Sequence, residues 1–284
     1  MTFQPETGAL VALLRSAKRP VPGYAALVEE AGSATVILED EQGLLAPQLL
    51  ATAKTEIEAW HAAGITLFTV LDPGYPPNLR AVHDRPPLVF VAGRLEPKDI
   101  RSVAVIGTRR PSSTGLESAG AVAEELVDAG FTVVSGLAAG IDTAAHAAAL
   151  SHGGRTVAVI GTGLNRAYPP QNASLQTRIA AEGAVISQFW PDAPPSRASF
   201  PKRNALMSGT ALATVVIEAG QTSGARTQAR LALAHGRPVL LMQSLLQQPW
   251  ASELATRPGT WVIRAPTEIA PLVERLSSTG ALVG

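Results

Sequence analysis

Clustered basic residues and glycine-rich loops are the features of this sequence best suited to chemistry. Arg109 and Arg110 lie in GTRRPSSTG, Lys202 and Arg203 in SFPKRNALMSG, and Arg226 in QTSGARTQA. Glycine lets the backbone approach an anion closely, and the first N–H groups of a helix have no partner within it. Brought together, these segments would form a basic cradle that binds a polyanion through its phosphates. The alternative is that the basic side chains lie on solvated helix faces and that the glycines only form tight turns.

Acidic and imidazole side chains offer a second type of chemistry. Asp142 and His146 are one helical turn apart, which suits acid–base catalysis or metal binding, but Asp142 is also well placed to cap the helix that runs to Gly153. We favour the structural interpretation. Glu218 ends the strand-like run ATVVI, where an acid can face a pocket. Cysteine is absent, which excludes disulfides, thiolate zinc sites and thiol catalysis. We predict no catalytic residue, no metal and no cofactor.

The loops need strands and helices that place them side by side. Val103 to Ile106 form an apolar, β-rich run, typical of a buried parallel strand that leads into a phosphate-binding turn. Thr114 and Glu117 fit a capping box, and apolar residues then recur at helical spacing until Gly130 ends the helix. A second strand-like run, residues 131–134, leads into SGLAAGID.

Strands and helices alternate from here to the end of the chain. The predicted strands are residues 103–106, 131–134, 156–160, 184–187, 213–217, 238–242 and 261–263. This alternation is typical of a mostly parallel sheet with helices on both faces. The carboxyl edge of such a sheet is the usual ligand crevice. We therefore predict an α/β fold with an extended Rossmann-like, mostly parallel sheet.

The first part of the chain has a different pattern. Residues 5–62 predict four short helices in a small bundle, within which residues 22–38 weakly resemble a SAM-like or helix-hairpin-helix element. Two strand-like runs, ITLFTV and LVFVAG, follow on either side of a stretch dense in turn residues. A loose boundary falls near residue 66. As working domains we take 1–85, helical with a lead-in segment, and 86–284, the Rossmann-like domain.

Composition limits the classes of function. The 284 residues, of which 46% are hydrophobic, suffice for one substantial core and a smaller companion. The formal net charge is zero, so any cationic site must be local. The N-terminus lacks a signal-peptide pattern, and no apolar run approaches the length of a membrane span. These features predict a cytoplasmic protein without a membrane partner.

A dinucleotide enzyme is disfavoured. The loop GTGLNRAYPPQN contains Gly161 and Gly163 but no third glycine at the dinucleotide spacing. Ser187 and Gln188 stand at the end of the next strand, where a ribose-binding acid would be expected.

Several motifs, in this order and spacing, resemble the DprA/Smf family of DNA-processing proteins: GTRRPSSTG, VVSGLAAGIDTAAH, GTGLNRAYPPQN, FPKRN and EAGQTSGARTQARLALAHGRPV. Together with the preceding DPGYPPNLRAVHDRPPLVFVAG, the resemblance covers about residues 64 to 240. It implies a protein that binds and protects single-stranded DNA, forms a homodimer and assists loading of the recombinase RecA during natural transformation or recombination. The family is not known for catalysis.

The resemblance places DNA-contacting basic side chains at Arg109 or Arg110 and at Lys202. It places an anion pocket at Ser135 and the glycines of SGLAAGID. Tyr168 and Phe200 are candidates for stacking on a base, or are packing residues. The full set of predicted DNA- or phosphate-binding residues is Gly107, Thr108, Arg109, Arg110, Ser135, Gly136, Leu137, Gly140, Gly161, Gly163, Lys202, Arg203, Asn204, Ser223, Gly224, Arg226 and Thr227.

Some positions depart from the family pattern. Ala205 stands where an arginine usually follows the asparagine of FPKRN, Arg226 lies within the SGARTQA segment, and the sequence after GRPV differs. We also expect no C-terminal winged-helix domain. A divergent relative in genome maintenance or antiphage defence is one alternative. A SLOG-like module for a nucleotide or nucleotide signal is another, and a phosphoribohydrolase-like enzyme using Glu218 a third, although the glycine-rich loop of those hydrolases is absent.

Overall fold

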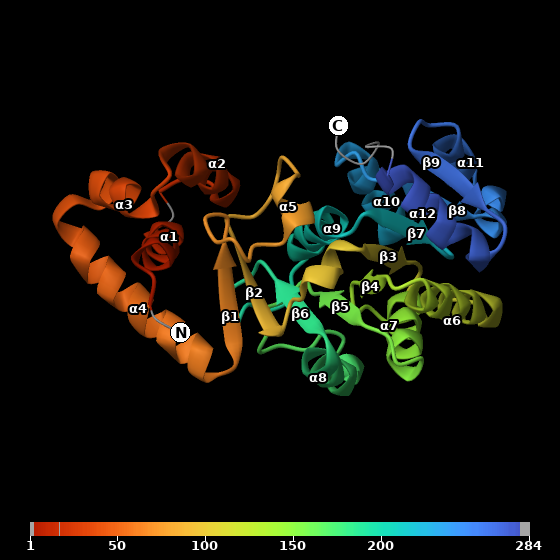
Figure 1. Cartoon of the computed structure of the whole chain (residues 1–284), viewed down its shortest axis with the longest axis horizontal. Coiled ribbons are helices and arrows are strands. Elements are labelled where there is room, and N and C mark those ends of the chain that lie inside the picture. Colours follow the sequence, from red (N-terminus) through yellow and green to blue (C-terminus); the bar gives the residue numbers. More distant parts are fainter. Residues whose placement is uncertain (1–2, 17, 279–284) are drawn as a thin grey trace.

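One nine-stranded sheet organises the described part of the chain, residues 3–16 and 18–278, in this computed structural model (Figure 1). The strand order is β1-β2-β6-β5-β4-β3-β7-β8-β9. The strands are β1 (Ile65–Thr69), β2 (Leu88–Gly93), β3 (Ser102–Ile106), β4 (Thr132–Ser135), β5 (Thr156–Val159), β6 (Ala184–Ser187), β7 (Ala213–Val216), β8 (Val239–Met242) and β9 (Thr260–Ile263).

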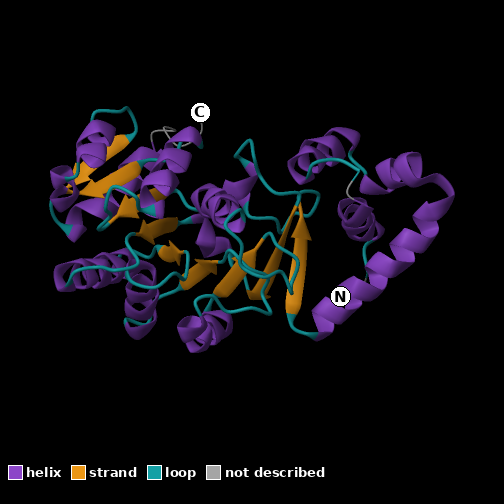
Figure 2. Ribbon diagram, turned by 180° about the vertical axis from the view of Figure 1, so that it is seen from behind, coloured by secondary structure: helices purple, strands orange, loops and turns teal. Residues whose placement is uncertain are grey.

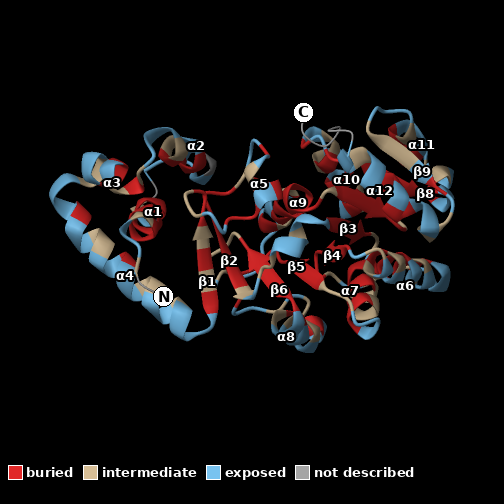
Figure 3. Ribbon diagram, viewed as in Figure 1, coloured by how far each residue is buried: buried red, intermediate tan, exposed pale blue. Residues whose placement is uncertain are grey.

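Most of the sheet is parallel. Strands β3 to β9 pair in parallel, whereas β2 pairs antiparallel with both β1 and β6. All residues of β3 to β8 are buried, which explains why their apolar runs show no polar alternation (Figure 3). The predicted α/β class is confirmed, and each of the predicted strands lies within a residue of its expected bounds.

Helices cover both faces of the sheet (Figures 1 and 2). On one face, α6, α7 and α8 pack against β3 to β6, and on the other α9 and α10 contact each other and the sheet. The helices are α1 (Pro5–Ser16), α2 (Val21–Ala31), α3 (Ala34–Gln42), α4 (Ala46–Ala62), α5 (Pro77–Arg80), α6 (Ser113–Asp128), α7 (Ile141–Ser151), α8 (Ala173–Glu182), α9 (Ser199–Thr210), α10 (Gly224–Ala234), α11 (Pro249–Ala255) and α12 (Ile269–Ser278).

The four helices expected before residue 62 are present as α1 to α4, and they pack at the β1 end of the sheet (Figure 1). Ser33 caps α3, as its side chain accepts a hydrogen bond from the Val36 N–H. Trp60 of α4 meets Phe90 of β2 edge-on, with ring centroids 5.1 Å apart, and lies 5.8 Å from the Trp190 ring. These aromatic contacts fasten the bundle to the sheet.

The sheet begins at Ile65, ahead of the working boundary at residue 85 and close to the loose boundary near residue 66. The division into two domains stays a prediction. Within the described residues, no helix has both the length and the apolar character that crossing a membrane requires.

One local prediction is wrong. The N-cap of α6 is Ser112, whose hydroxyl accepts from the Gly115 N–H, and not Thr114 in a capping box. Ser112 is held in place by Glu218, since its hydroxyl donates to the Glu218 Oε2 at 2.7 Å. The stop at Gly130 is confirmed by its left-handed φ of 73° just beyond the helix.

Candidate nucleic-acid interface

The first and the fifth strands of the parallel sheet, β3 and β7, lie side by side, and the chain leads away from them in opposite directions across the sheet. From β3 the chain proceeds to β4, β5 and β6 on one side, and from β7 to β8 and β9 on the other. Such a reversal opens a crevice beyond the carboxyl ends of the two strands. The loops that follow them are joined there, because the Thr108 N–H donates to the Glu218 carbonyl at 2.6 Å.

Two of the hollows at this edge adjoin each other. The larger, of about 470 Å³, lies between the loop after β3, the helix α9 and the N-terminus of α10. The smaller, of about 170 Å³, lies between α9, the loop after β4 and the loop after β5. Residues common to both are Arg109, Ala138, Phe200 and Arg203. The two hollows therefore form one groove along the carboxyl edge.

A cation and two aromatic rings lie in a row along this groove. The Arg109 guanidinium stands 5.3 Å from the centre of the Phe200 ring, and the Tyr168 ring is 5.6 Å from Phe200. Tyr168 keeps 40% of its surface exposed, which is unusual for a large aromatic residue that serves only packing. This row offers a flat apolar surface beside a positive charge, the combination that suits stacked bases and their phosphates.

Three of the predicted basic side chains form no ion pair in the described part of the chain. Arg109, Arg110 and Lys202 are exposed, and none of their side chains forms an ion pair within the described ranges. Arg109 and Arg110 line the larger hollow, whereas Lys202 lies on the exposed side of α9 and lines neither. The expected cradle is thus built mainly from the loop after β3, with Lys202 beside it.

Arg203 differs from its neighbour Lys202. It is only 6% exposed, and its guanidinium donates to the carbonyls of Gly136 and, at 3.1 Å, Val159. Its Nε also donates to the Asn204 Oδ1 at 2.9 Å. Burial lowers the pKa of Arg203 from its usual value. Arg203 and Asn204 border the hollow, but the arginine serves chiefly to hold the loops beneath it.

Asp142 is the buried acid that accompanies Arg203. Its Oδ2 accepts hydrogen bonds from the N–H groups of Gly136 and Ala138, at 3.2 and 3.4 Å, so it does not cap α7 as expected; the N-cap is Gly140. Burial raises the pKa of Asp142, and the positive charge of Arg203 opposes that rise. The anion expected in the SGLAAGID loop is therefore supplied by the chain itself.

The loop after β4 is a structural platform. Ser135 is fully buried and donates to the Val105 carbonyl at 2.6 Å, and Leu137 is fully buried in a left-handed conformation with φ 55°. Gly140, with φ 85°, lies against the Thr108 carbonyl, where any side chain would collide. Neither Ser135, Leu137 nor Gly140 lines a hollow, whereas Gly136 lines the smaller one. The predicted anion pocket around Ser135 is not formed, because the Ser135 hydroxyl bonds to a backbone carbonyl and the loop N–H groups of Gly136 and Ala138 bond to the Asp142 carboxylate.

The other predicted residues divide in a similar way. Gly107, Thr108, Ser223 and Gly224 line the larger hollow, and Gly161 the smaller. Ser223 is the N-cap of α10, so the positive end of that helix faces the hollow. The hollows are not lined by Gly163, Arg226 or Thr227.

Both acid–base candidates make structural contacts, although only His146 is fully buried; Glu218 is half-buried and lines a separate hollow of about 480 Å³. His146 is fully buried with its Nδ1 2.7 Å from the Thr156 hydroxyl, and burial lowers its pKa to about 3. The carboxylate of Glu218 accepts from the N–H and hydroxyl of Ser112, so it holds the cap of α6. The structural interpretation of His146 is supported, while Asp142 is structural in a different manner from the one predicted.

Two residues in or beneath the groove escaped the sequence analysis. Gln228 is 1% exposed and lines the larger hollow, and neither end of its amide has a hydrogen-bond partner. An unpaired buried amide is costly, so this one is available to a ligand. Asn172 donates to the Leu137 carbonyl at 2.9 Å and to the Thr143 hydroxyl at 2.8 Å, which fixes the loop after β4. Helical spacing from Ser223 would have placed Gln228 near the hollow.

Fold and site together define a Rossmann-like α/β protein with a groove at the carboxyl edge of its parallel sheet. The groove presents exposed arginine side chains beside aromatic rings. A family model described as DNA recombination-mediator protein A matches residues 66–257. The chain therefore belongs to that family, which includes the DprA and Smf proteins, and the predicted family is confirmed.

Individual relatives agree with this assignment. The Smf protein of a Synechocystis species is 42% identical over 172 residues, which cover 59% of this chain and 43% of that protein. The structure of DNA processing protein A from Streptococcus pneumoniae matches with a TM-score of 0.76 at 30% identity, over 95% of this chain and 98% of that one. DNA processing protein A from Helicobacter pylori, a protein with a described single-stranded DNA binding mode, matches with a TM-score of 0.64 at 26% identity, over 74% and 96%. The chain spans about half the length of the curated relatives that it matches.

Proposed function

We propose that this protein binds single-stranded DNA in the groove at the carboxyl edge of its sheet. The observation that carries the proposal is the row formed by Arg109, Phe200 and Tyr168, which joins the two hollows. A single strand exposes both its phosphates and the faces of its bases, whereas a duplex hides the faces. DNA processing protein A from Helicobacter pylori, for which a single-stranded DNA binding mode is described, supports the same ligand.

Phosphates and bases are assigned to different residues. Arg109 and Arg110 are exposed and unpaired in the part of the chain that the structure describes, so they supply charge to the phosphates, with Lys202 beside them. Phe200 and Tyr168 supply the stacking surface. Affinity then depends on salt and only weakly on base sequence, because phosphates and base faces are common to all sequences. We assign no catalytic step to the groove.

A nucleotide-binding module is the second candidate, and one observation favours it. The unpartnered amide of Gln228 in the larger hollow can pair with the edge of a single base. The hollow's volume of about 470 Å³ is also within the range of small-ligand sites. This alternative uses the larger hollow alone and does not require Tyr168.

Fluorescence anisotropy with a labelled oligo-dT strand and a matching duplex, each titrated at two salt concentrations, separates the two candidates. We expect tighter binding to the single strand, with an affinity that falls as salt rises. No binding to either DNA, together with a rise in melting temperature on addition of a mononucleotide, would replace the proposal with the nucleotide-binding module.

We also propose that the protein protects single strands as a homodimer in the cytoplasm and assists the loading of a RecA-type recombinase. The family assignment supports this part of the proposal. Light scattering after size-exclusion chromatography tests the dimer. Recombinase loading is tested by adding the protein to single strands coated with single-strand-binding protein and measuring the rate of RecA filament formation, and an unchanged rate would exclude it.

A further inference from the structure

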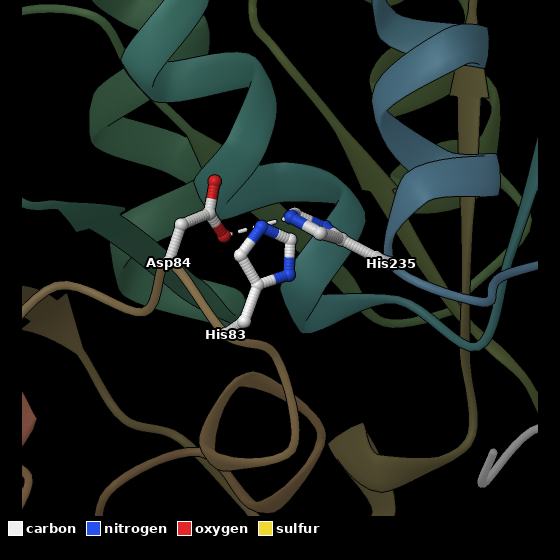
Figure 4. A group of neighbouring side chains, drawn as sticks. All are labelled: His83, Asp84 and His235. Carbon is white, nitrogen blue, oxygen red and sulfur yellow. Dashed lines mark hydrogen bonds and ion pairs between the residues drawn. The ribbon is translucent and has the colours of Figure 1, made fainter.

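A second group of side chains with binding chemistry lies away from the groove. His83 and Asp84 are in the loop between α5 and β2, and His235 is the residue that ends α10 (Figure 4). Their potential ligand atoms all lie within 4.8 Å of one another. Two segments separated by some 150 positions in the sequence thus bring two imidazoles and one carboxylate together.

The arrangement of these side chains is specific. Asp84 Oδ1 lies 2.7 Å from His235 Nε2, and one ring nitrogen of His83 faces this pair (Figure 4). The two imidazole rings are 5.5 Å apart at their centres and nearly perpendicular.

Ser208 orients His235 from behind. The Ser208 hydroxyl is fully buried and lies 2.8 Å from His235 Nδ1, which leaves Nε2 pointed at Asp84. Histidines that ligate metals commonly have their second ring nitrogen held by an oxygen in this manner. The orientation of the buried His235 ring is thus fixed before an ion binds, while His83 and Asp84 are exposed and able to adjust around an incoming ion.

The hydrogen-bonded chain Ser208–His235–Asp84 has the residue types of a hydrolytic Ser–His–Asp triad. Ser208 is fully buried, and its hydroxyl also donates to the Ala205 carbonyl at 3.1 Å. No substrate can reach that oxygen, which excludes the serine as a nucleophile. The open side of the cluster is the one that His83 and Asp84 form.

We propose that His83, Asp84 and His235 bind a divalent transition-metal ion, Zn²⁺ foremost. Two imidazoles and a carboxylate are a ligand set that Zn²⁺ accepts, and three protein ligands leave a fourth position for water. Ligand atoms around Zn²⁺ stand about 2.0 to 2.2 Å from the metal, so His83 has to turn toward the pair and the Asp84 carboxylate has to draw back from His235 Nε2. Both His83 and Asp84 are exposed, which permits these movements. The ion would then clamp the loop before β2 to the end of α10, the helix whose other end faces the groove.

The test uses the full-length protein without a polyhistidine tag. Zn²⁺ is titrated in competition with a chromophoric chelator, and the melting temperature is recorded with and without the ion. We expect one Zn²⁺ per chain and a higher melting temperature with the ion, since a ligand that binds only the folded state stabilises it. A parent protein that binds no Zn²⁺ would overturn the proposal.

Variants locate the ion. His83→Gln and Asp84→Asn change exposed residues and are each expected to weaken Zn²⁺ binding at least tenfold, while Ser208→Ala weakens it by about 10- to 100-fold through loss of orientation. The matched control is His152→Gln, since His152 also pairs with an aspartate, Asp128, at 2.8 Å, but belongs to no three-ligand group in the described ranges. Equal binding by His83→Gln and the parent, or a loss in His152→Gln instead, would refute the assignment. None of these measurements depends on DNA binding.

Discussion

Arg110 offers the most direct test of phosphate binding in the groove. Its side chain is exposed, lines the larger hollow and forms no ion pair within the described residues. If Arg109, Arg110 and Lys202 each neutralise one phosphate of a single strand, log affinity falls with log salt with a slope of about −2. Raising salt from about 50 to about 200 mM then weakens binding about 20-fold. For Arg110→Gln the slope falls to about −1.4, and the same change in salt weakens binding only about 7-fold.

Anisotropy titrations of labelled oligo-dT over several salt concentrations measure both slopes. The matched control is Arg257→Gln, which removes the same charge just before β9, at the amino edge of the sheet. Arg257 is exposed and 3.8 Å from Glu253, so its loss should alter neither fold nor groove. If log affinity falls with log salt at the same slope for the parent and for Arg110→Gln, Arg110 does not contact a phosphate. A change of slope in Arg257→Gln equal to that in Arg110→Gln would refute the placement as well.

Three further changes test other parts of the structure. Phe200→Leu should weaken single-strand binding by about 1 to 3 kcal/mol with an unchanged salt slope, because stacking is lost and charge is kept; unchanged affinity would argue against stacking. Arg203→Met removes the positive charge that acts most strongly on buried Asp142 and the bonds to the Gly136 and Val159 carbonyls, and urea titration should show about 3 to 5 kcal/mol less stability; a near-neutral effect would contradict a structural role of the buried Arg203 charge. Burial lowers the pKa of His146 from 6.5 to about 3, so below pH 6.5 the unfolded chain binds a proton that the folded chain does not, and stability is lost as pH falls. Between about pH 7 and pH 5 the parent should lose about 2 kcal/mol more than His146→Gln in urea titrations, and equal losses would show that His146 titrates normally.

The strands were predictable because their physical cause is local. A parallel strand covered on both faces has no solvent side, so the runs at residues 103–106, 157–160 and 239–242 are apolar throughout and are followed by glycine or glutamine. The α6 cap was not predictable in the same way. Ser112, Ser113 and Thr114 all carry hydroxyls, and Ser112 is selected because Glu218, more than a hundred residues away, binds it.

Roles within the groove depend on which way each side chain faces. Lys202 and Arg203 are adjacent and equally basic in the sequence, but the rotation of α9 exposes the lysine and buries the arginine among loop carbonyls. Ser135 looks like an anion ligand in SGLAAGID, yet its hydroxyl is bonded to Val105. Periodicity predicts that a helix exists, whereas its rotation is decided by packing against elements far away in the chain.

The amino-acid sequence by itself therefore determined the α/β class, the order of the elements, the family and the loops that carry bases and glycines. Only the tertiary structure decided that Arg109, Phe200 and Tyr168 form one row, and that His83 and His235 meet. The physical reason is range: strand and helix formation depend on neighbours along the chain, whereas burial and the pairing of charges depend on groups that only folding brings together.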